Sequence, residues 1–352
     1  MSVLGELAVA VVQAPMAGGP STPELAAAVS EAGGLGFVAA GYKSVESVRT
    51  DVETTRALTA RPFGVNVFVG GGEPAEPELV EAYAARLRAE VGRVGVPLGE
   101  PRFDDDAFDE KVELLCEERV AVVSFTFGLP SRDAVDRLHE AGSEVWITVT
   151  SPAEARTAAR VGADALVVQG VEAGGHRGVF TDDDQAADLT LLVALQLVRA
   201  AVDLPLVATG GIATGAAVGA VLVAGAAAAQ VGSVYLRSPE AGTSAAQRAA
   251  TATAAPTKLT RAFTGRLARG IVNRLLTEHG EAAPRAYPEV HHLTAPLRAH
   301  GRSTGDADLI NLWAGQAHEL APDLPAAEIT RQLGDEARAA VAAVHARLAP
   351  GA

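Results

Sequence analysis

The sequence predicts an α/β fold: a (β/α)8 TIM barrel followed by a C-terminal helical subdomain. Short apolar runs alternate with alanine-rich helical stretches from the start to about residue 233, and there are eight such runs. The runs are continuously apolar, as in parallel strands covered by helices on both faces. The alternative is a doubly wound open sheet. We favour the barrel because no G-x-G-x-x-G sequence opens the first unit and because two glycine turns come late in the series.

The expected strands follow one another with helices between them. The first strand, 9–14, precedes a helix whose start is marked by Thr22 as N-cap and Pro23 in the first turn. Gly33 and Gly34 then mark its end. The other strands are expected at residues 35–40, 63–69, 120–127, 144–150, 164–169, 205–211 and 226–233.

Two regions depart from the alternation of strands and helices. The segment at about 70–105 is rich in Glu, Pro and Arg and is expected to be a barrel insertion that contains one helix. Residues 234–352 combine Pro-, Thr- and Arg-containing loops with several helical segments. We therefore expect a barrel over residues 1–233 and a mainly helical subdomain over 234–352, packed on the barrel mouth.

Composition excludes several classes of protein. The 352 residues are 48% hydrophobic and carry a formal net charge of −14, which argues against a nucleic-acid-binding surface. The single cysteine, Cys116, excludes an intramolecular disulfide and is expected to be packing filler on a helix. The most apolar run is broken by Gly219, Gly225 and Gly232, so no membrane span is expected. Without a secretory signal, the protein is expected in the cytoplasm.

One histidine, His176, is predicted to lie at the catalytic end of the barrel. Gln169 ends the predicted strand 164–169, and Gly174 and Gly175 precede His176 in a loop that runs to about residue 187. Loops of this length after a barrel strand are often functional, and an imidazole titrates near neutral pH. The alternative is a structural histidine. Arg177 is expected to be a solvated loop arginine, with attraction of a substrate carboxylate as the other interpretation.

Glycine turns after the last two expected strands favour a phosphate-bearing ligand. Gly210 and Gly211 follow one strand, and the segment Gln230–Ser233 ends the other. Backbone N–H groups at these two places often bind phosphate in barrels, although such glycines also serve tight packing. Asn66 offers an amide near the tip of the third strand. The sequence contains no H-x-x-x-H spacing of metal ligands, and no metal site is expected.

Seven segments together resemble the class I nitronate monooxygenases, formerly called 2-nitropropane dioxygenases. They occur in family order between about residues 8 and 316: QAPMAGGPSTPELAAAVSEAGGLGFVAAG, FGVNVFV, GADALVVQGVEAGGH, ATGGI, QVGS, RAFTGRLARGIVN and LWAGQ. Flavin-dependent enoyl-acyl carrier protein reductases carry a similar EAGGH loop, but the opening segment and TGRLARG favour the nitronate enzymes. Leu267 stands where the family pattern has a proline.

The resemblance implies an FMN-containing barrel with His176 as the catalytic residue over the flavin. Gly211, Gly232 and Ser233 would lie nearest the FMN phosphate. The full set of implied cofactor-binding residues is Met16, Ala17, Asn66, Gln169, Gly174, Gly175, Gly210, Gly211, Gln230, Val231, Gly232 and Ser233, with Met16 and Ala17 along the isoalloxazine.

The implied reaction is the oxidation of alkyl nitronates, propionate 3-nitronate among them, by O2. It would give a carbonyl compound and nitrite through a flavin semiquinone. The alternatives are an FMN-dependent NAD(P)H enoyl-acyl carrier protein reductase and a non-redox barrel that binds a phosphorylated metabolite. No nucleic acid or membrane partner is expected, and assembly as a homodimer is left open.

Overall fold

The computed structural model describes residues 2–70, 74–183 and 188–348, so parts of the predicted insertion and of the loop after His176 lie outside it. Its main sheet has eight parallel strands in the order β1–β9–β8–β6–β5–β4–β3–β2. Their bounds are β1 (Val11–Gln13), β2 (Gly36–Ala39), β3 (Phe63–Phe68), β4 (Val122–Thr126), β5 (Glu144–Val149), β6 (Ala165–Gln169), β8 (Leu206–Thr209) and β9 (Ala228–Val231). Each lies within one of the predicted runs.

The first two strands close the sheet into a barrel. A parallel bridge joins Val12 to Leu35, just before β2. The Gln13 N–H donates to the Leu35 carbonyl at 2.9 Å, and the Leu35 N–H donates to the Val11 carbonyl at 3.0 Å. The predicted (β/α)8 barrel is confirmed, and the open doubly wound sheet is wrong, because β1 pairs with β9 on one side and with this segment on the other.

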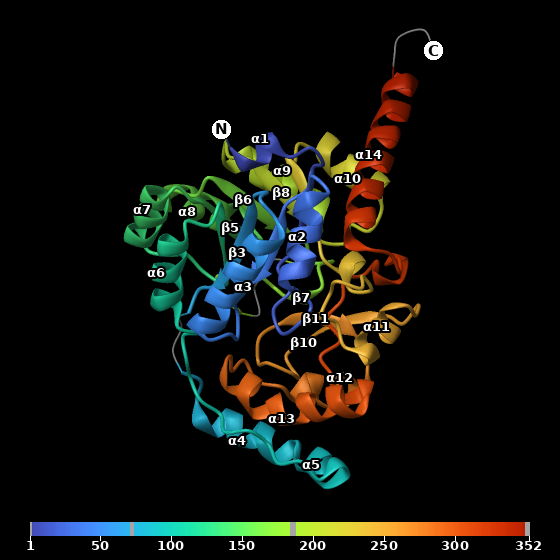
Figure 1. The fold of residues 1–352 in the computed structure, drawn as a ribbon. Helices are drawn as coiled ribbons and strands as arrows, with labels where there is room; N and C mark the ends of the chain where they lie inside the picture. The colour runs from blue at the N-terminus through green and yellow to red at the C-terminus, as the bar shows by residue number, and fades with distance from the viewer. Residues whose placement is uncertain (1, 71–73, 184–187, 349–352) are drawn as a thin grey trace.

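Helices cover the outside of the barrel (Figure 1). The first of them begins where the sequence indicated: the Thr22 hydroxyl accepts from the Leu25 N–H at 3.1 Å, and Pro23 is the first residue of α2. The helices between barrel strands are α2 (Pro23–Glu31), α3 (Val45–Leu58), α6 (Phe108–Glu118), α7 (Arg132–Ala141), α8 (Pro152–Val161), α9 (Leu191–Ala201) and α10 (Gly215–Val223). A short helix α1 (Val3–Glu6) precedes the first strand.

The C-terminal region adds helices on two sides of the barrel and a small sheet over its mouth. The helices are α11 (Ala245–Thr251), α12 (Arg274–His279), α13 (Glu289–Thr304) and α14 (Ala326–Leu348). Helix α14 packs along α10 on the barrel wall, where a Cβ at Gly215 would lie 2.1 Å from the Glu336 side chain. The small sheet has the order β10 (Thr257–Thr260), β11 (Ala268–Ile271) and β7 (Gly175–His176).

The insertion after β3 contains two helices, α4 (Pro77–Arg86) and α5 (Arg88–Val94), so the prediction of one helix was wrong. The chain turns at Leu87, which is fully buried. Leu87 joins Val80 and Tyr83 in an apolar cluster with Val290 and Leu293 of α13. The break in the helix lets both halves pack against the C-terminal region. Sequence periodicity does not predict this break, because it depends on contacts with a distant part of the chain.

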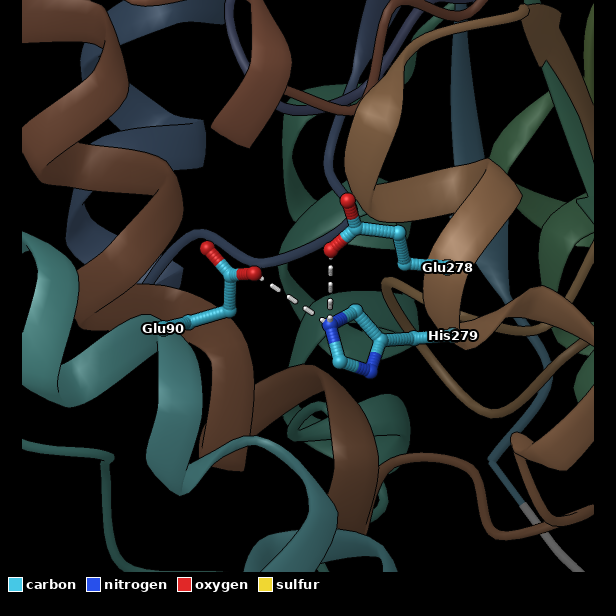
Figure 2. A group of neighbouring side chains, drawn as sticks. All are labelled: Glu90, Glu278 and His279. Carbon is cyan, nitrogen blue, oxygen red and sulfur yellow. Dashed lines mark hydrogen bonds and ion pairs between the residues drawn. The ribbon is translucent and has the colours of Figure 1, made fainter.

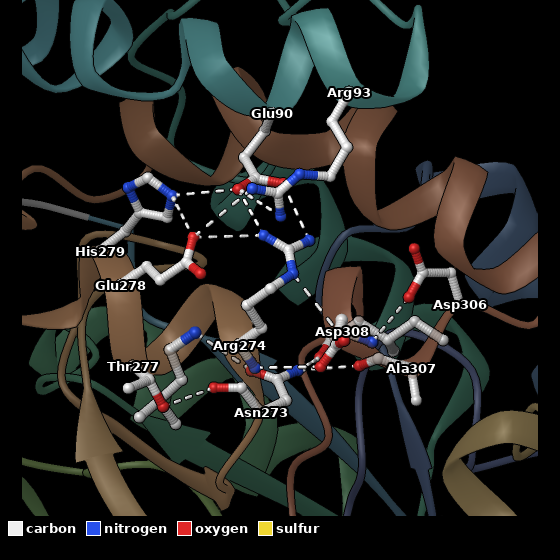
Figure 3. A network of polar contacts seen from close by, with 12 residues as sticks. Glu90, Arg93, Asn273, Arg274, Thr277, Glu278, His279, Asp306, Ala307 and Asp308 are labelled. Carbon is white, nitrogen blue, oxygen red and sulfur yellow. Dashed lines mark hydrogen bonds and ion pairs between the residues drawn. The ribbon is translucent and has the colours of Figure 1, made fainter.

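Buried charges join this insertion to α12. Figure 2 shows Glu90 of α5 facing Glu278 and His279 of α12. The Nε2 atom of His279 lies 3.3 Å from Glu90 Oε1 and 4.0 Å from Glu278 Oε2. Figure 3 shows Arg274 reaching the same carboxylate, with Nη1 at 2.6 Å from Oε1 and Nη2 at 3.0 Å from Oε2. Burial alone would raise the pKa of Glu90, but hydrogen bonds from Arg274 and His279 outweigh it and lower that pKa.

Replacing Glu90 by Gln is expected to lower the free energy of unfolding by about 3 kcal/mol at pH 7, because Arg274 and its neighbours lose a buried anion. The Glu90 contribution is present while the carboxylate is ionised, above its unfolded-state pKa. It is lost as the pH falls through the lowered folded-state pKa. Urea unfolding at several pH values measures both effects.

Asp335→Asn is the matched control, because Asp335 pairs with Arg338 on the exposed face of α14. Loss of this exposed ion pair is expected to change the free energy of unfolding by less than about 1 kcal/mol. Equal effects of the two substitutions would contradict the anchoring role of Glu90.

Candidate active site

A cavity of about 390 Å³ lies at the carboxyl ends of the barrel strands. On several strands, the inward-facing side chains change from apolar to polar toward this end. Trp146 is followed by Thr148 on β5, and Val207 is followed by Thr209 on β8; the apolar members form the barrel floor. The polar members line the cavity: Asn66, Thr126, Thr148, Gln169, Thr209 and Gln230. The barrel therefore closes below the cavity and presents hydrogen-bonding groups to its contents.

Every residue that the sequence analysis assigned to catalysis or cofactor binding lines this cavity. These residues come from the loops or strand ends of β1, β3, β6, β8 and β9. They are Met16, Ala17, Asn66, Gln169, Gly174, Gly175, His176, Gly210, Gly211, Gln230, Val231, Gly232 and Ser233.

The loop that carries His176 is held as a short strand. His176 pairs with Ala268, and Gly175 pairs with Arg269, both antiparallel. Gly175 has φ +73°, and a Cβ at Gly174 would lie 2.5 Å from the backbone of Ala314, so both glycines are required by the path of the chain. The pairing fixes His176 over the barrel mouth.

Gln169 supports this loop from below. Its Nε2 donates to the His176 carbonyl at 3.0 Å, and its Oε1 accepts from Arg177 Nη1 at 2.8 Å. Arg177 also donates to the Gly170 carbonyl at 2.8 Å and is only 2% exposed. The expectation of a solvated Arg177 was therefore wrong. Its guanidinium is buried and donates hydrogen bonds to Gln169 and Gly170 at the end of β6.

Leu267 also acts through its backbone in this region. Its N–H donates to Asp182 Oδ2 at 3.2 Å, a bond that the proline of the family pattern has no hydrogen to make. Its carbonyl accepts from the Arg177 N–H at 2.8 Å, which continues the pairing of β7 with β11. The turn before β11 is thus tied to the loop after His176.

Thr264 orients the His176 ring and favours one of its tautomers. His176 Nε2 lies 2.9 Å from Thr264 Oγ1. The same hydroxyl donates to the Arg266 carbonyl at 3.2 Å, so its proton is directed away from the imidazole. Nε2–H is then the donor to Thr264, and Nδ1 keeps its lone pair. Nδ1 makes no hydrogen bond with any residue in the described ranges.

His176 is neutral in this environment. Burial, together with the charges of Arg266 and Arg298, lowers its pKa to about 3. Three aromatic rings contribute to the burial, with ring centroids 5.5 Å (Trp313), 5.6 Å (Phe127) and 6.0 Å (Tyr287) from the imidazole. At neutral pH the imidazole therefore supplies no positive charge, and its free Nδ1 is available as an acceptor.

The ends of β8 and β9 form a cradle for an anion. Gly210 and Gly211 have φ of +124° and +68°, a path that glycine follows without strain. The N–H groups of Gly211, Gly232 and Ser233 have no hydrogen-bond acceptor among the residues that the structure describes. Three unpaired donors from two adjacent strand ends fit the oxygens of a phosphate group.

Several cavity residues come from the C-terminal region and were not found from the sequence. Arg298 and Arg302 of α13 are the charged side chains of the described lining, which contains no Asp, Glu or Lys. His291 of the same helix stacks on Tyr42 with ring centroids 4.1 Å apart. These residues carry no local motif; only the folding of α13 over the barrel mouth brings them to the cavity.

A separate cluster has metal-ligand chemistry. Glu90, Glu278 and His279 place their ligand atoms within 4.8 Å of one another. Arg274 and Arg93 already approach the Glu90 carboxylate, at 2.6 Å and 3.4 Å, so two guanidinium groups neutralise it. The geometry is that of an ion-pair network rather than of a cation cage.

The comparisons with known proteins decide the family. The family model described as nitronate monooxygenase matches residues 2–336. This chain belongs to the nitronate monooxygenase family. It is 41% identical to the nitronate monooxygenase of Pseudomonas aeruginosa over 93% of this chain and 96% of that protein.

Solved structures agree with this assignment. The chain is similar to the nitroalkane oxidase of Streptomyces ansochromogenes, with a TM-score of 0.94 and 48% identity over 97% of this chain and 100% of that one. It is also similar to FabK of Thermotoga maritima, with a TM-score of 0.77 and 26% identity over 98% of each chain. The family is one of oxidoreductases. Within the described ranges, no helix is both long and apolar enough to span a membrane.

The environment of His176 predicts that its imidazole does not titrate between pH 5 and 8, because the pKa near 3 leaves it neutral throughout. NMR of ¹⁵N-histidine-labelled protein measures this, with the His176→Asn spectrum identifying the signal. A midpoint near pH 6.5 would contradict the assigned burial.

Proposed function

We propose that this protein is an FMN-dependent nitronate monooxygenase that oxidises alkyl nitronates with O2 to a carbonyl compound and nitrite. The observation that carries the proposal is the composition of the cavity: a neutral His176 and a cationic Arg298 face the same space as a cradle of backbone donors. The family assignment supports the substrate class.

The residues present fit FMN. Gly211, Gly232 and Ser233 would bind the phosphate through their free N–H groups. Asn66 donates through Nδ2 to Ser124 Oγ at 2.9 Å and to Thr126 Oγ1 at 3.1 Å, which leaves its Oδ1 for a polar ring edge. The remaining cofactor residues would be Met16, Ala17, Gln169, Gly174, Gly175, Gly210, Gln230 and Val231. FMN supplies the electron-transfer chemistry, and the protein binds, orients and excludes competing reactions.

The chain's own contribution centres on His176 and Arg298. Nδ1 of His176 is the proton acceptor for a neutral nitroalkane: the α-carbon proton moves to Nδ1, and the C–H electron pair moves onto the nitro oxygens. The aromatic rings of Phe127, Tyr287 and Trp313 surround the imidazole and contribute to its burial. A preformed nitronate needs no such transfer, and binding and orientation are then the chain's task.

Purified protein is expected to show the absorption spectrum of bound flavin and to consume O2 with alkyl nitronates, releasing nitrite. The experiment combines a visible spectrum, released-FMN analysis and oxygen uptake. Rapid anaerobic bleaching by NAD(P)H would favour an enoyl-acyl carrier protein reductase. Protein that takes up no FMN would favour a barrel that binds a phosphorylated metabolite without redox chemistry.

His176→Asn is expected to retain FMN and to lower turnover of a neutral nitroalkane by roughly 10²- to 10⁴-fold, because the variant lacks the proton acceptor. Turnover of the matching nitronate should fall less. The control is His139→Asn, on the outer helix α7, where the imidazole contacts Asp164 at 2.8 Å. Wild-type turnover of the nitroalkane by His176→Asn would exclude the proposed proton transfer.

A further inference from the structure

Arg298 is a buried cation without an anionic partner. Its side chain is 5% exposed, yet it lines the cavity. Nε donates to Thr294 Oγ1 at 3.1 Å, and Nη2 donates to the His291 carbonyl at 2.7 Å. Nη1 makes no hydrogen bond within the described ranges, and no described carboxylate lies within 4.0 Å of the guanidinium. One edge of a fixed guanidinium is thus left for a ligand.

The surroundings hold this guanidinium rigidly. The Thr294 hydroxyl that accepts from Nε itself donates to the Phe263 carbonyl at 2.5 Å. His291 Nδ1 lies 3.2 Å from Nη2, and the His291 ring is stacked on Tyr42. Burial lowers the pKa of Arg298 to about 10, so the group remains charged at neutral pH. A charge held this far from water is costly unless an anion accompanies it.

The position of Arg298 separates it from the phosphate cradle. Its neighbour His291 packs on Tyr42, which follows β2, whereas the cradle follows β8 and β9. In the strand order of this closed barrel, β1 lies between β2 and β9, and β8 lies one strand further away. Arg298 and the glycine turns therefore come from different regions of the chain, and each has its own unpaired donors for an anion. His176 lies within the field of Arg298, since that charge contributes to lowering the pKa of the imidazole.

We propose that Arg298 binds the anionic oxygens of the substrate's nitronate group through Nη1 and selects this anion over neutral molecules of the same size. The inference rests on the proposed function for the identity of the anion. A nitronate is planar, carries one negative charge and has two oxygens. Nη1 offers N–H donors whose direction is fixed by the bonds of Nε and Nη2, whereas a lysine ammonium rotates freely. The same contact stabilises the charge that reaches the nitro oxygens when His176 accepts a proton.

The test compares Arg298→Gln with Arg298→Lys and Arg331→Gln in FMN-loaded enzyme. Arg331 is exposed on α14 and does not line the cavity, so Arg331→Gln reports the effect of one fewer positive charge alone. Arg298→Gln is expected to raise KM for nitronates by roughly 10- to 100-fold, as for loss of a charged hydrogen bond. Arg298→Lys should recover part of the loss, and Arg331→Gln should raise KM by at most about threefold.

Inorganic nitrate and acetamide provide a readout that does not need turnover. Both are small and planar, but only nitrate is an anion. Calorimetry is expected to show that Arg298→Gln weakens nitrate binding at least tenfold while leaving acetamide binding unchanged. Equal weakening of both, or unchanged nitrate binding, would overturn the inference. If wild-type protein binds nitrate through Arg298 but oxidises no nitronate, the anion site stands and the proposed function fails.

Discussion

The antiparallel pairing of Gly175 and His176 with Arg269 and Ala268 is the constraint on which the rest of the site depends. A histidine in an unpaired loop would be solvated and would titrate near its ordinary pKa. The pairing instead places the imidazole between the strand ends of the barrel and the C-terminal region. Thr264 lies in the same region and takes the Nε2–H bond. Backbone geometry thereby determines which ring nitrogen faces the cavity.

The charged side chains of the described cavity lining are all positive. The chain has a net charge of −14, yet the described cavity lining contains arginine and no carboxylate. A neutral imidazole beside an unneutralised guanidinium disfavours cations and favours an anion or a group that becomes one. The glycine turns after β8 and β9 present unpaired backbone donors, which we propose as a second anion site. Under this proposal, two anions of different shape have separate places in one cavity.

Local signals predicted the barrel, because strand length, apolar continuity and helix capping are short-range properties. Thr22 and Pro23 begin α2 as expected, and the glycine turns lie at the cavity. Contacts between residues far apart in the sequence could not be predicted from these short-range properties. The pairing of β7 with β11 joins residues about 90 positions apart, Arg177 became a buried support for Gln169, and Arg298 reaches the cavity only through the packing of α13. Thr264 was likewise present in a recognised motif, but its role depends on its distance from His176.

A crystal structure of the FMN-loaded protein tests the central claim most directly. The account predicts the phosphate on the backbone N–H groups of Gly211, Gly232 and Ser233, and the flavin ring beneath His176 with Nδ1 directed into the cavity. It also predicts that the hydrogen bond between His176 and Thr264 is retained. A flavin bound elsewhere, or an imidazole that turns Nδ1 toward Thr264, would contradict the account.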